Sequence, residues 1–249
     1  MLAPKSALIW DLIEGLTLPR FSLFYFPGPH HIGAKIQLNS ERSNYLCRAL
    51  RLNIGDEINI FDGNGALFTA IISKANPRST DVEITAARPP ANSRLYSLTL
   101  AIGLIKGAAM DRALQRATEL GAGKILLIQA DRSNVPLKSD RIENKRGHWE
   151  RVISASCEQC GQLYLPELKK PQTLEGVINQ TENGIVFHSS GEAFPAQMSP
   201  VNRTAFIGPE GGWSDKELDL FLQNQMPRYK LGSTILRAET MPSVALGLI

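Results

Sequence analysis

Two short segments near the C-terminus combine charged side chains with glycines. Residues 207–214 read IGPEGGWS, and residues 231–240 read LGSTILRAET. Glycine allows positive φ and close backbone approach, so both turns can present bare N–H and C=O groups to a ligand. Residues 214–217 form a capping box that predicts a helix between the two turns, and a helix start adds unpaired N–H groups. Two facing turns of this kind predict a pocket for a small polar molecule.

The charged residues of the two turns are Glu210, Arg237 and Glu239. A glutamate carboxylate can accept a proton, and the planar guanidinium of Arg237 can stabilise a developing anion. The alternative is an ion pair between Arg237 and either glutamate that only shapes the turn. We expect the pocket at the carboxyl ends of strands, where open α/β sheets bind ligands.

Other ligand motifs are missing or weak. No G-x-G-x-x-G follows an early strand and no loop ends in G-K-[ST], which argues against nicotinamide or phosphate-loop chemistry. Cys157 and Cys160 form a C-x-x-C pattern, which also occurs in zinc and redox sites. Further ligands at zinc spacing are lacking, and the pair falls inside a predicted helix. We therefore expect packing cysteines and no metal.

Composition limits the class of protein. The 249 residues are 43% hydrophobic and 20% charged, as in ordinary globular proteins of one large or two modest domains. A net charge of +3 permits nucleic-acid binding without demanding it. No apolar run approaches the roughly 20 residues that span a bilayer. Asp11 and Glu14 interrupt the apolar run at the N-terminus, and three cysteines fit a reducing compartment, so we expect a cytoplasmic protein without membrane contact.

The first third of the chain reads as a small β domain, which we place at residues 20–88. Alternating apolar residues predict strands at 36–38, 57–61, 67–72 and 82–84. The sequence DGNG at 62–65 predicts a hairpin turn, and residues 40–50 predict a helix capped by Asn39 or Ser40. Residues 1–19 form an extension whose order stays open, since a short helix and a loose tail are equally compatible with it.

Residues 89–97 read as a linker, because Pro89 and Pro90 stop both helix and strand. The rest of the chain, 98–249, alternates strand-like and helix-like segments, which predicts a parallel α/β sheet. The expected strands are 98–105, 125–128, 185–187 and 205–207, and the expected helices are 110–120, 141–160 and 214–224. Residues 188–192 would follow a strand as a third wall of the pocket.

The two turns resemble the signature of the RsmE family of SPOUT methyltransferases, GPEGG(F/W)S..E followed by LG..ILR.ET. Further similarity lies at residues 106–107, 117–121 and 158–159, and the resemblance covers about residues 20–240. The residues that match the signature are Gly208, Pro209, Glu210, Gly211, Gly212, Ser214, Glu217, Leu231, Gly232, Ile235, Leu236, Arg237, Glu239 and Thr240.

This resemblance implies a two-part α/β fold. A C-terminal SPOUT-type parallel sheet with a trefoil knot would follow a small N-terminal PUA-like, RNA-binding β-barrel. Physical reasoning alone would not propose a knot, because threaded chains are rare. A homodimer is also implied, with the last helix supporting dimer contact and cofactor pocket. Here Met241 and Pro242 stand where the family has small residues, so we expect cofactor affinity and dimer stability to be the properties affected.

The implied activity is S-adenosylmethionine-dependent methylation of N3 of a uridine in 16S ribosomal RNA, within the small ribosomal subunit. Arg237 would stabilise the uracil oxygens or anion, and Glu210 or Glu239 would accept the proton or hold Arg237. The residues expected to contact the cofactor are His188, Ile207, Gly208, Pro209, Glu210, Gly211, Gly212, Leu231, Gly232, Ile235, Leu236 and Thr240.

The residues expected to bind RNA are Arg20, Arg48, Arg51, Lys106 and Arg132. Arg48 and Arg51 would share one face near a helix end and neutralise phosphates, although arginines also suit a solvated helix C-terminus. In the family the helix at 141–160 carries a Glu-Gln pair, here Glu158 and Gln159. Two rival functions stay open: a SPOUT methyltransferase acting on a different RNA, and a non-catalytic RNA-binding protein of ribosome assembly.

Overall fold

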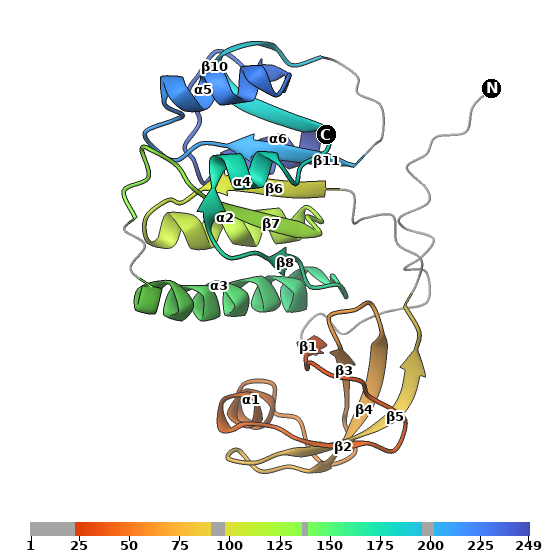
Figure 1. Ribbon diagram of the computed structural model, residues 1–249. Coiled ribbons are helices and arrows are strands. Elements are labelled where there is room, and N and C mark those ends of the chain that lie inside the picture. Colours follow the sequence, from red (N-terminus) through yellow and green to blue (C-terminus); the bar gives the residue numbers. More distant parts are fainter. Residues whose placement is uncertain (1–22, 91–97, 136–138, 196–201) are drawn as a thin grey trace, which may run out of the picture. The chain divides into compact units, whose positions relative to one another are not determined.

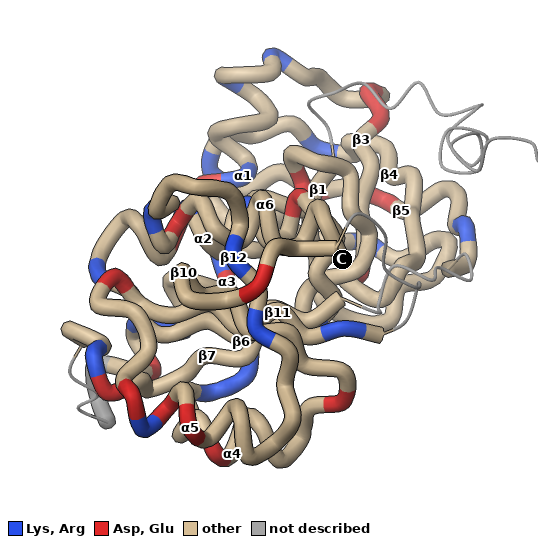
Figure 2. The backbone as a smooth tube through the Cα atoms, turned by 90° about the horizontal axis from the view of Figure 1, so that it is seen from above, with Lys and Arg blue, Asp and Glu red and all other residues tan. Residues whose placement is uncertain are grey.

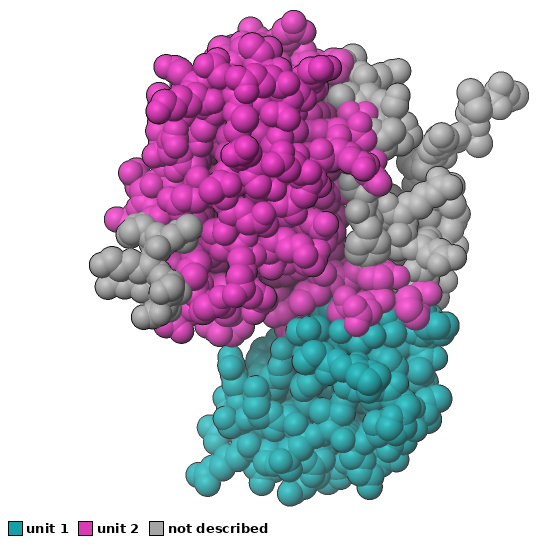
Figure 3. All heavy atoms as spheres, viewed as in Figure 1, with its two compact units in different colours: residues 1–62, 66–89 teal, residues 63–65, 90–249 magenta. Residues whose placement is uncertain are grey.

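The computed structural model describes residues 23–90, 98–135, 139–195 and 202–249 (Figure 1). The chain divides into two compact units, residues 1–62 with 66–89 and residues 63–65 with 90–249 (Figure 3). The expected extension, 1–19, and most of the expected linker lie outside the described residues. Our boundaries at residues 20, 88 and 98 therefore stay a proposal.

The first unit contains a curled five-stranded sheet. The strand order is β1–β3–β4–β5–β2, and neighbours are antiparallel except β1 and β3. The strands are β1 (Leu23–Tyr25), β2 (Lys35–Gln37), β3 (Glu57–Phe61), β4 (Leu67–Lys74) and β5 (Asp81–Arg88). Apolar residues that alternate along these strands, such as Ile58 and Ile60 of β3, are fully buried in the core of the unit. The predicted DGNG turn lies between β3 and β4.

The helix expected at residues 40–50 is only half correct. An α-helix, α1 (Ser40–Asn44), begins where Asn39 caps it by accepting a hydrogen bond from the Arg42 N–H at 2.9 Å. It continues as a π-helix, η1 (Tyr45–Ala49), and ends before Arg51, whose φ is 57°. Arg48 and Arg51 therefore do not share a helical face. The reason is a local π-turn, in which Leu50 bonds back to Tyr45, and sequence periodicity does not reveal such a turn.

The second unit is built on a parallel sheet of seven strands. Six follow the order β12–β10–β11–β6–β7–β8, and β9 pairs with the far end of β7. The strands are β6 (Leu98–Gly103), β7 (Lys124–Gln129), β8 (Glu167–Leu168), β9 (Gln172–Thr173), β10 (Gly184–Ala193), β11 (Arg203–Ile207) and β12 (Arg228–Lys230). The helices are α2 (Ala108–Glu119), α3 (Ser139–Cys160), α4 (Leu174–Ile178), α5 (Asp215–Gln223) and α6 (Met241–Leu248).

Helices cover both faces of this sheet, as Figure 1 shows for α4 in front and α6 behind. On one face, α4 and α5 bury Val177 and Phe221 against Val186 and Phe206 of the central strands. Helix α6 contacts β6 and β11, and it also packs on α2, which in turn packs on α3. The parallel α/β sheet predicted from the alternation of segments is confirmed. The trefoil knot stays a prediction.

One expected loop is a strand. Residues 188–192, predicted to follow a strand as a pocket wall, continue β10, which runs to Ala193. The pairing of β10 with β12 shifts register between Phe187 and Glu192, so the strand is irregular there. Polar residues and Gly191 made this stretch look like a loop, but pairing with β12 keeps it extended.

Helix α5 begins with the predicted capping box. The Ser214 hydroxyl accepts from the Glu217 N–H, and the Glu217 carboxylate accepts from the Ser214 N–H at 2.7 Å. The other oxygen of the buried Glu217 carboxylate accepts from the Asp131 N–H at 3.0 Å. Asp131 follows β7, so Glu217 ties the loop after β7 to the start of α5.

We expect Glu217→Ala to lower the free energy of unfolding by about 1–3 kcal/mol, because two backbone N–H groups lose their acceptor. Chemical denaturation followed by circular dichroism measures this. Lys216→Ala, at an exposed position in the same turn, is the matched control and should change stability by less than about 0.5 kcal/mol. Equal stability of Glu217→Ala and the unmodified protein would contradict the assignment.

Candidate active site

A cavity of about 850 Å³ opens where β11 ends, beside residues 187–189 of β10. Residues 208–212, the GPEGG turn, and residues 231–240, the C-terminal segment, form most of its wall. Arg132, Arg237 and Glu239 also line it. The predicted cofactor residues that line this cavity are His188, Ile207, Gly208, Pro209, Glu210, Gly211, Gly212, Leu231, Gly232, Ile235 and Leu236. Thr240 is not part of the lining. The pocket between two glycine turns that the sequence predicts is thus present.

The GPEGG turn is pressed against the end of β6. A Cβ added to Gly103, the last residue of β6, would lie 2.6 Å from Pro209 Cδ, so only glycine fits there. Within the turn, the Gly212 N–H donates to the Pro209 carbonyl at 2.8 Å. Gly212 and Gly232 have φ of 68° and 73°, and a Cβ added to either would meet nothing within 4 Å. The space where a side chain would stand is therefore open at both residues, which line the cavity.

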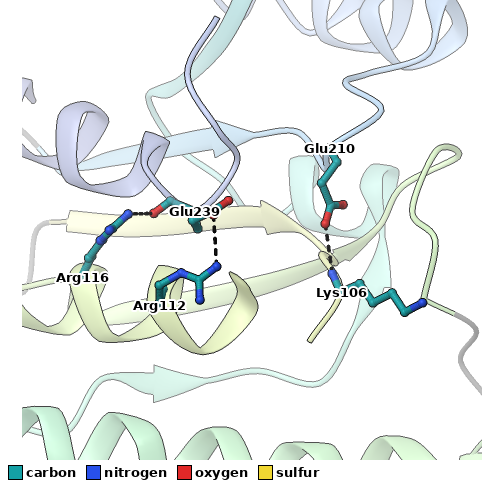
Figure 4. A network of polar contacts seen from close by, with 5 residues as sticks. All are labelled: Lys106, Arg112, Arg116, Glu210 and Glu239. Carbon is teal, nitrogen blue, oxygen red and sulfur yellow. Dashed lines mark hydrogen bonds and ion pairs between the residues drawn. The ribbon is translucent and has the colours of Figure 1, made fainter. Parts of the chain in front are cut away.

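Glu210 connects the GPEGG turn to the segment that precedes α2. Its carboxylate accepts a hydrogen bond from the Lys106 backbone N–H at 3.2 Å. The Lys106 ammonium points away from Glu210 (Figure 4), and Lys106 does not line the cavity. In this structure Lys106 thus contributes through its backbone, whereas the sequence suggested a side-chain contact to RNA.

Arg132 holds the other side of the GPEGG turn. Its guanidinium donates to the Gly211 carbonyl at 3.2 Å, while the side chain stays exposed. A Cβ added to Gly211 would lie 2.9 Å from Arg132 Cβ, which again requires glycine. The neighbouring Asp131 accepts from the Ser214 hydroxyl at 2.6 Å. The loop after β7 is therefore bonded to the C-terminal part of the turn, at Gly211, and to Ser214 just beyond it.

Glu239 is the most strongly held carboxylate of the site. Arg112 donates to its carboxylate at 3.2 Å, and Arg116 donates to its backbone carbonyl at 2.5 Å (Figure 4). A hydrogen bond from its own backbone N–H, together with the charge of Arg112, holds the pKa of the Glu239 carboxyl below its usual value. A carboxyl with a lowered pKa is a poor proton acceptor near neutral pH. Of the two roles considered for Glu239, positioning fits better than general base.

Arg237 is exposed at the cavity. Among the described residues, it forms no ion pair with Glu210 or Glu239; the partners of these carboxylates are Lys106 and Arg112. The charge of Arg237 still contributes to the low pKa of the Glu239 carboxyl. This structure therefore does not contain the alternative arrangement, an ion pair between Arg237 and Glu210 or Glu239 that only shapes the turn. Within the described residues, no carboxylate pairs with its guanidinium.

His188 is the cavity's imidazole. Its Nδ1 lies 3.2 Å from the backbone N–H of Ser190 and accepts that hydrogen bond, so the neutral ring carries its proton on Nε2. Burial lowers the pKa of His188 below its usual value, and the charges of Arg228 and Arg132 lower it further. Near pH 7 the ring is neutral and offers an N–H donor.

The remaining candidates lie elsewhere. Arg20 lies outside the described residues, and Arg48 and Arg51 belong to the first unit. Glu158 and Gln159 are on α3 and do not line the cavity. Cys157 is buried, which raises the pKa of its thiol, but Cys160 is exposed, so only one of the two cysteines packs as expected. Within the described residues, no group of three His, Cys, Asp or Glu could hold a metal ion.

Sequence reasoning missed the residues that hold the walls in place. Arg112 and Arg116 stand four apart on α2, which predicts a shared face, yet their partner Glu239 is 123 or more residues away in the chain. No local signal connects residues at that separation. The lining residues outside the predicted pocket segments are Phe187, Lys230 and Met241, and those inside these segments that were not named as contacts are Ser189, Trp213, Ser233, Thr234 and Ala238.

Both units match known protein families. Residues 91–249 match the RNA methyltransferase domain, and residues 38–85 match the RNA methyltransferase PUA domain. Because the first match covers more than half of the chain, this protein belongs to that family of RNA methyltransferases. In the described part of the chain, no helix combines the length and apolar character needed to traverse a bilayer.

Individual relatives refine the comparison. Proteins named ribosomal RNA small subunit methyltransferase E, the name that RsmE abbreviates, are 28% identical in Synechocystis sp. (88% of this chain, 73% of theirs) and Buchnera aphidicola (92% and 94%). The structure of a putative methyltransferase from Legionella pneumophila, in complex with S-adenosylmethionine, has a TM-score of 0.82 at 28% identity and covers 90% of this chain and 95% of its own. The predicted RsmE relationship is confirmed.

We expect the imidazole of His188 to titrate below pH 6.5, because burial and two arginines disfavour its charged form. The unfolded chain then binds more protons than the folded one, so this residue's contribution to stability falls as pH drops below 6.5. NMR titration of the ring measures the pKa, and Arg228→Gln should move it upward. A pKa at or above 6.5 would contradict the described environment.

Proposed function

We propose that this protein transfers a methyl group from S-adenosylmethionine to N3 of a uridine in 16S ribosomal RNA, in the cytoplasm and within the small ribosomal subunit. The observation that carries the proposal is the cavity, in which both signature turns of the family face one space. The names of the relatives, and the cofactor in the Legionella structure, support the same activity.

The cavity fits this cofactor in size and in chemistry. A volume of about 850 Å³ lies within the range of roughly 300–1,000 Å³ usual for small-molecule sites. Ile207, Leu231 and Leu236 offer apolar surface for a purine ring. The missing side chains of Gly212 and Gly232 leave room for the cofactor to approach the backbone, and the neutral His188 adds an N–H donor.

The bound cofactor supplies a methyl group on a positively charged sulfur, so the protein has to present a nucleophile. N3 of neutral uracil carries a proton, which must leave as the bond to carbon forms. Arg237 suits the negative charge that develops on the uracil oxygens, since its donors are not engaged by other described residues. Glu210 is the better proton acceptor, because Glu239 is held by Arg112 and Arg116.

The RNA would be bound by basic residues of both units. Lysines and arginines are interspersed with acidic residues along the backbone (Figure 2), in keeping with the modest net charge. Arg48 and Arg51 in the PUA unit are exposed and can contact phosphates, as Arg132 can beside the cavity. We keep Arg20 and Lys106 as further RNA contacts. The target base would leave its stack to reach the cavity.

We further propose that the protein is a homodimer in which α6 faces the partner copy. Leu248 of α6 is 47% exposed and Ile235 is 91% exposed, although both are apolar. A second, largely apolar cavity of about 770 Å³ is lined by Phe194, Val244 and Leu248, among others. The lining residues that it shares with the first cavity are Lys230, Leu231, Gly232, Ser233 and Leu236. An identical copy would cover this surface.

Deletion of the gene in its host should remove one N3-methyluridine from 16S ribosomal RNA, and the unmodified gene should restore it. Mass spectrometry of nuclease fragments measures this. Loss of a methyl group from another RNA instead would favour a SPOUT enzyme with a different target. No change in any RNA, with no binding of S-adenosylmethionine in calorimetry, would favour a non-catalytic RNA-binding protein.

Arg237→Ala should lower kcat by about 100-fold or more at saturating cofactor, because a donor to the developing anion is lost. Single-turnover methylation of small subunits lacking the modification provides the measurement. Arg151→Ala, an exposed arginine of α3, is the matched control and should keep full activity. Full methyl transfer by Arg237→Ala would exclude the role assigned to Arg237.

A further inference from the structure

Helix α2 and the residues before it contact both walls of the cavity (Figure 4). At the approach to the helix, the Lys106 N–H donates to Glu210 of the GPEGG turn at 3.2 Å. Farther along, Arg112 and Arg116 donate to Glu239 of the C-terminal segment. One short stretch of chain therefore touches both signature turns, which are separated by about a helix and a strand in sequence.

Glu239 is held by hydrogen bonds from two arginines of α2. Arg112 and Arg116 are four residues apart, so they lie on one face of α2. Arg112 bonds the Glu239 carboxylate at 3.2 Å, and Arg116 bonds the Glu239 carbonyl at 2.5 Å. The Glu239 side chain is only 11% exposed, whereas that of Arg112 is 48% exposed. Side chain and backbone of a single residue are thus fixed to the same helix.

The bonds to Glu239 hold a part of the chain that has little regular secondary structure. Residues 231–237 belong to no helix or strand, so no ladder of hydrogen bonds fixes their backbone. Among the described residues, the backbone bonds that hold this end of the segment begin at the Arg237 carbonyl, which accepts from Thr240 and Met241. Arg237 lies two residues before Glu239. Fixing Glu239 therefore also fixes the place of Arg237 at the cavity.

We propose that Arg112 and Arg116 are positioning residues that hold the C-terminal segment in its cofactor-binding arrangement. Helix α2 and the residue Lys106 before it then set the distance between the two turns. Glu239 is the residue through which α2 holds the C-terminal segment, and it is not the catalytic base. The proposal deepens the proposed function and rests on it for the identity of the cofactor. Neither arginine lines the cavity.

A loosened segment would weaken cofactor binding by lowering the fraction of protein that is ready to bind. Apparent affinity falls in proportion to that fraction, while the bound state and its reaction rate are unaffected. Because Arg112 is half exposed, its pair with Glu239 is partly screened by water. We expect Arg112→Gln to weaken S-adenosylmethionine binding about fivefold.

The test is a double-mutant cycle of Arg112→Gln and Glu239→Gln, with the affinity for S-adenosylmethionine measured by calorimetry on the full chain. If both residues act through one ion pair, the double variant binds no more weakly than the weaker single variant. Gln115→Ala is the matched control, since the Gln115 side chain on the same helix donates to Glu119 at 2.8 Å and, within the described residues, to neither signature turn. It should bind the cofactor normally, and Arg112→Lys should recover part of the loss.

The readouts separate positioning from general stability. Arg112→Gln should raise KM for the cofactor with kcat nearly unchanged, and should lower the thermal midpoint by no more than about 3 °C. Unchanged affinity, additive effects of the two substitutions, or a fall in kcat alone would each overturn the proposal. Calorimetry uses no RNA, so a wrong target base would leave this result intact. Failure of the unmodified protein to bind the cofactor would instead refute the proposed function.

Discussion

The active site depends on keeping two irregular segments at a fixed separation. The GPEGG turn and the C-terminal segment form the walls of the cavity, but neither is part of a helix or a strand. Their geometry is set by what they rest on. Pro209 is seated on Gly103 at the end of β6, and Glu239 is bonded to α2, which follows β6 directly in the chain. Both walls of the cavity are therefore positioned by contacts with β6 and α2, which are consecutive in the chain.

Three acidic residues of the signature bond distant parts of the chain to one another around the cavity. Glu210 bonds the backbone before α2, Glu217 bonds the backbone after β7, and Glu239 is bonded by two arginines of α2. Each joins parts of the chain that are distant in sequence. A carboxylate suits this task because its two oxygens accept several hydrogen bonds, and charge-assisted bonds are the stronger ones. Arg237 differs from them, since no carboxylate of the described residues pairs with its guanidinium.

The sequence predicted the parallel α/β sheet, the capping box at Ser214 and the pocket between the glycine turns. These features follow from local patterns, namely alternation of segments, side-chain types at a helix start and the backbone freedom of glycine. The errors arise where local pattern and structure differ. Because a π-turn forms at Tyr45, the helix ends before Arg51. Because residues after His188 pair with β12, the expected loop there is a strand.

The contacts of Arg112, Arg116 and Glu239 could not be predicted in the same way. They depend on how α2 and α6 pack, which brings residues more than 100 positions apart into contact. Spacing on α2 indicates only that two arginines share a face. For the same reason, the sequence could not choose between Glu210 and Glu239 as proton acceptor, since the choice depends on which carboxylate an arginine already holds.

The account depends on S-adenosylmethionine lying between the two turns. A crystal structure with this cofactor tests that claim most directly. We predict density that contacts the backbone near Gly211 on one side and near Leu236 on the other, with the Arg112–Glu239 bond intact. Cofactor bound elsewhere on the chain, or contacting only one of the two turns, would contradict the account.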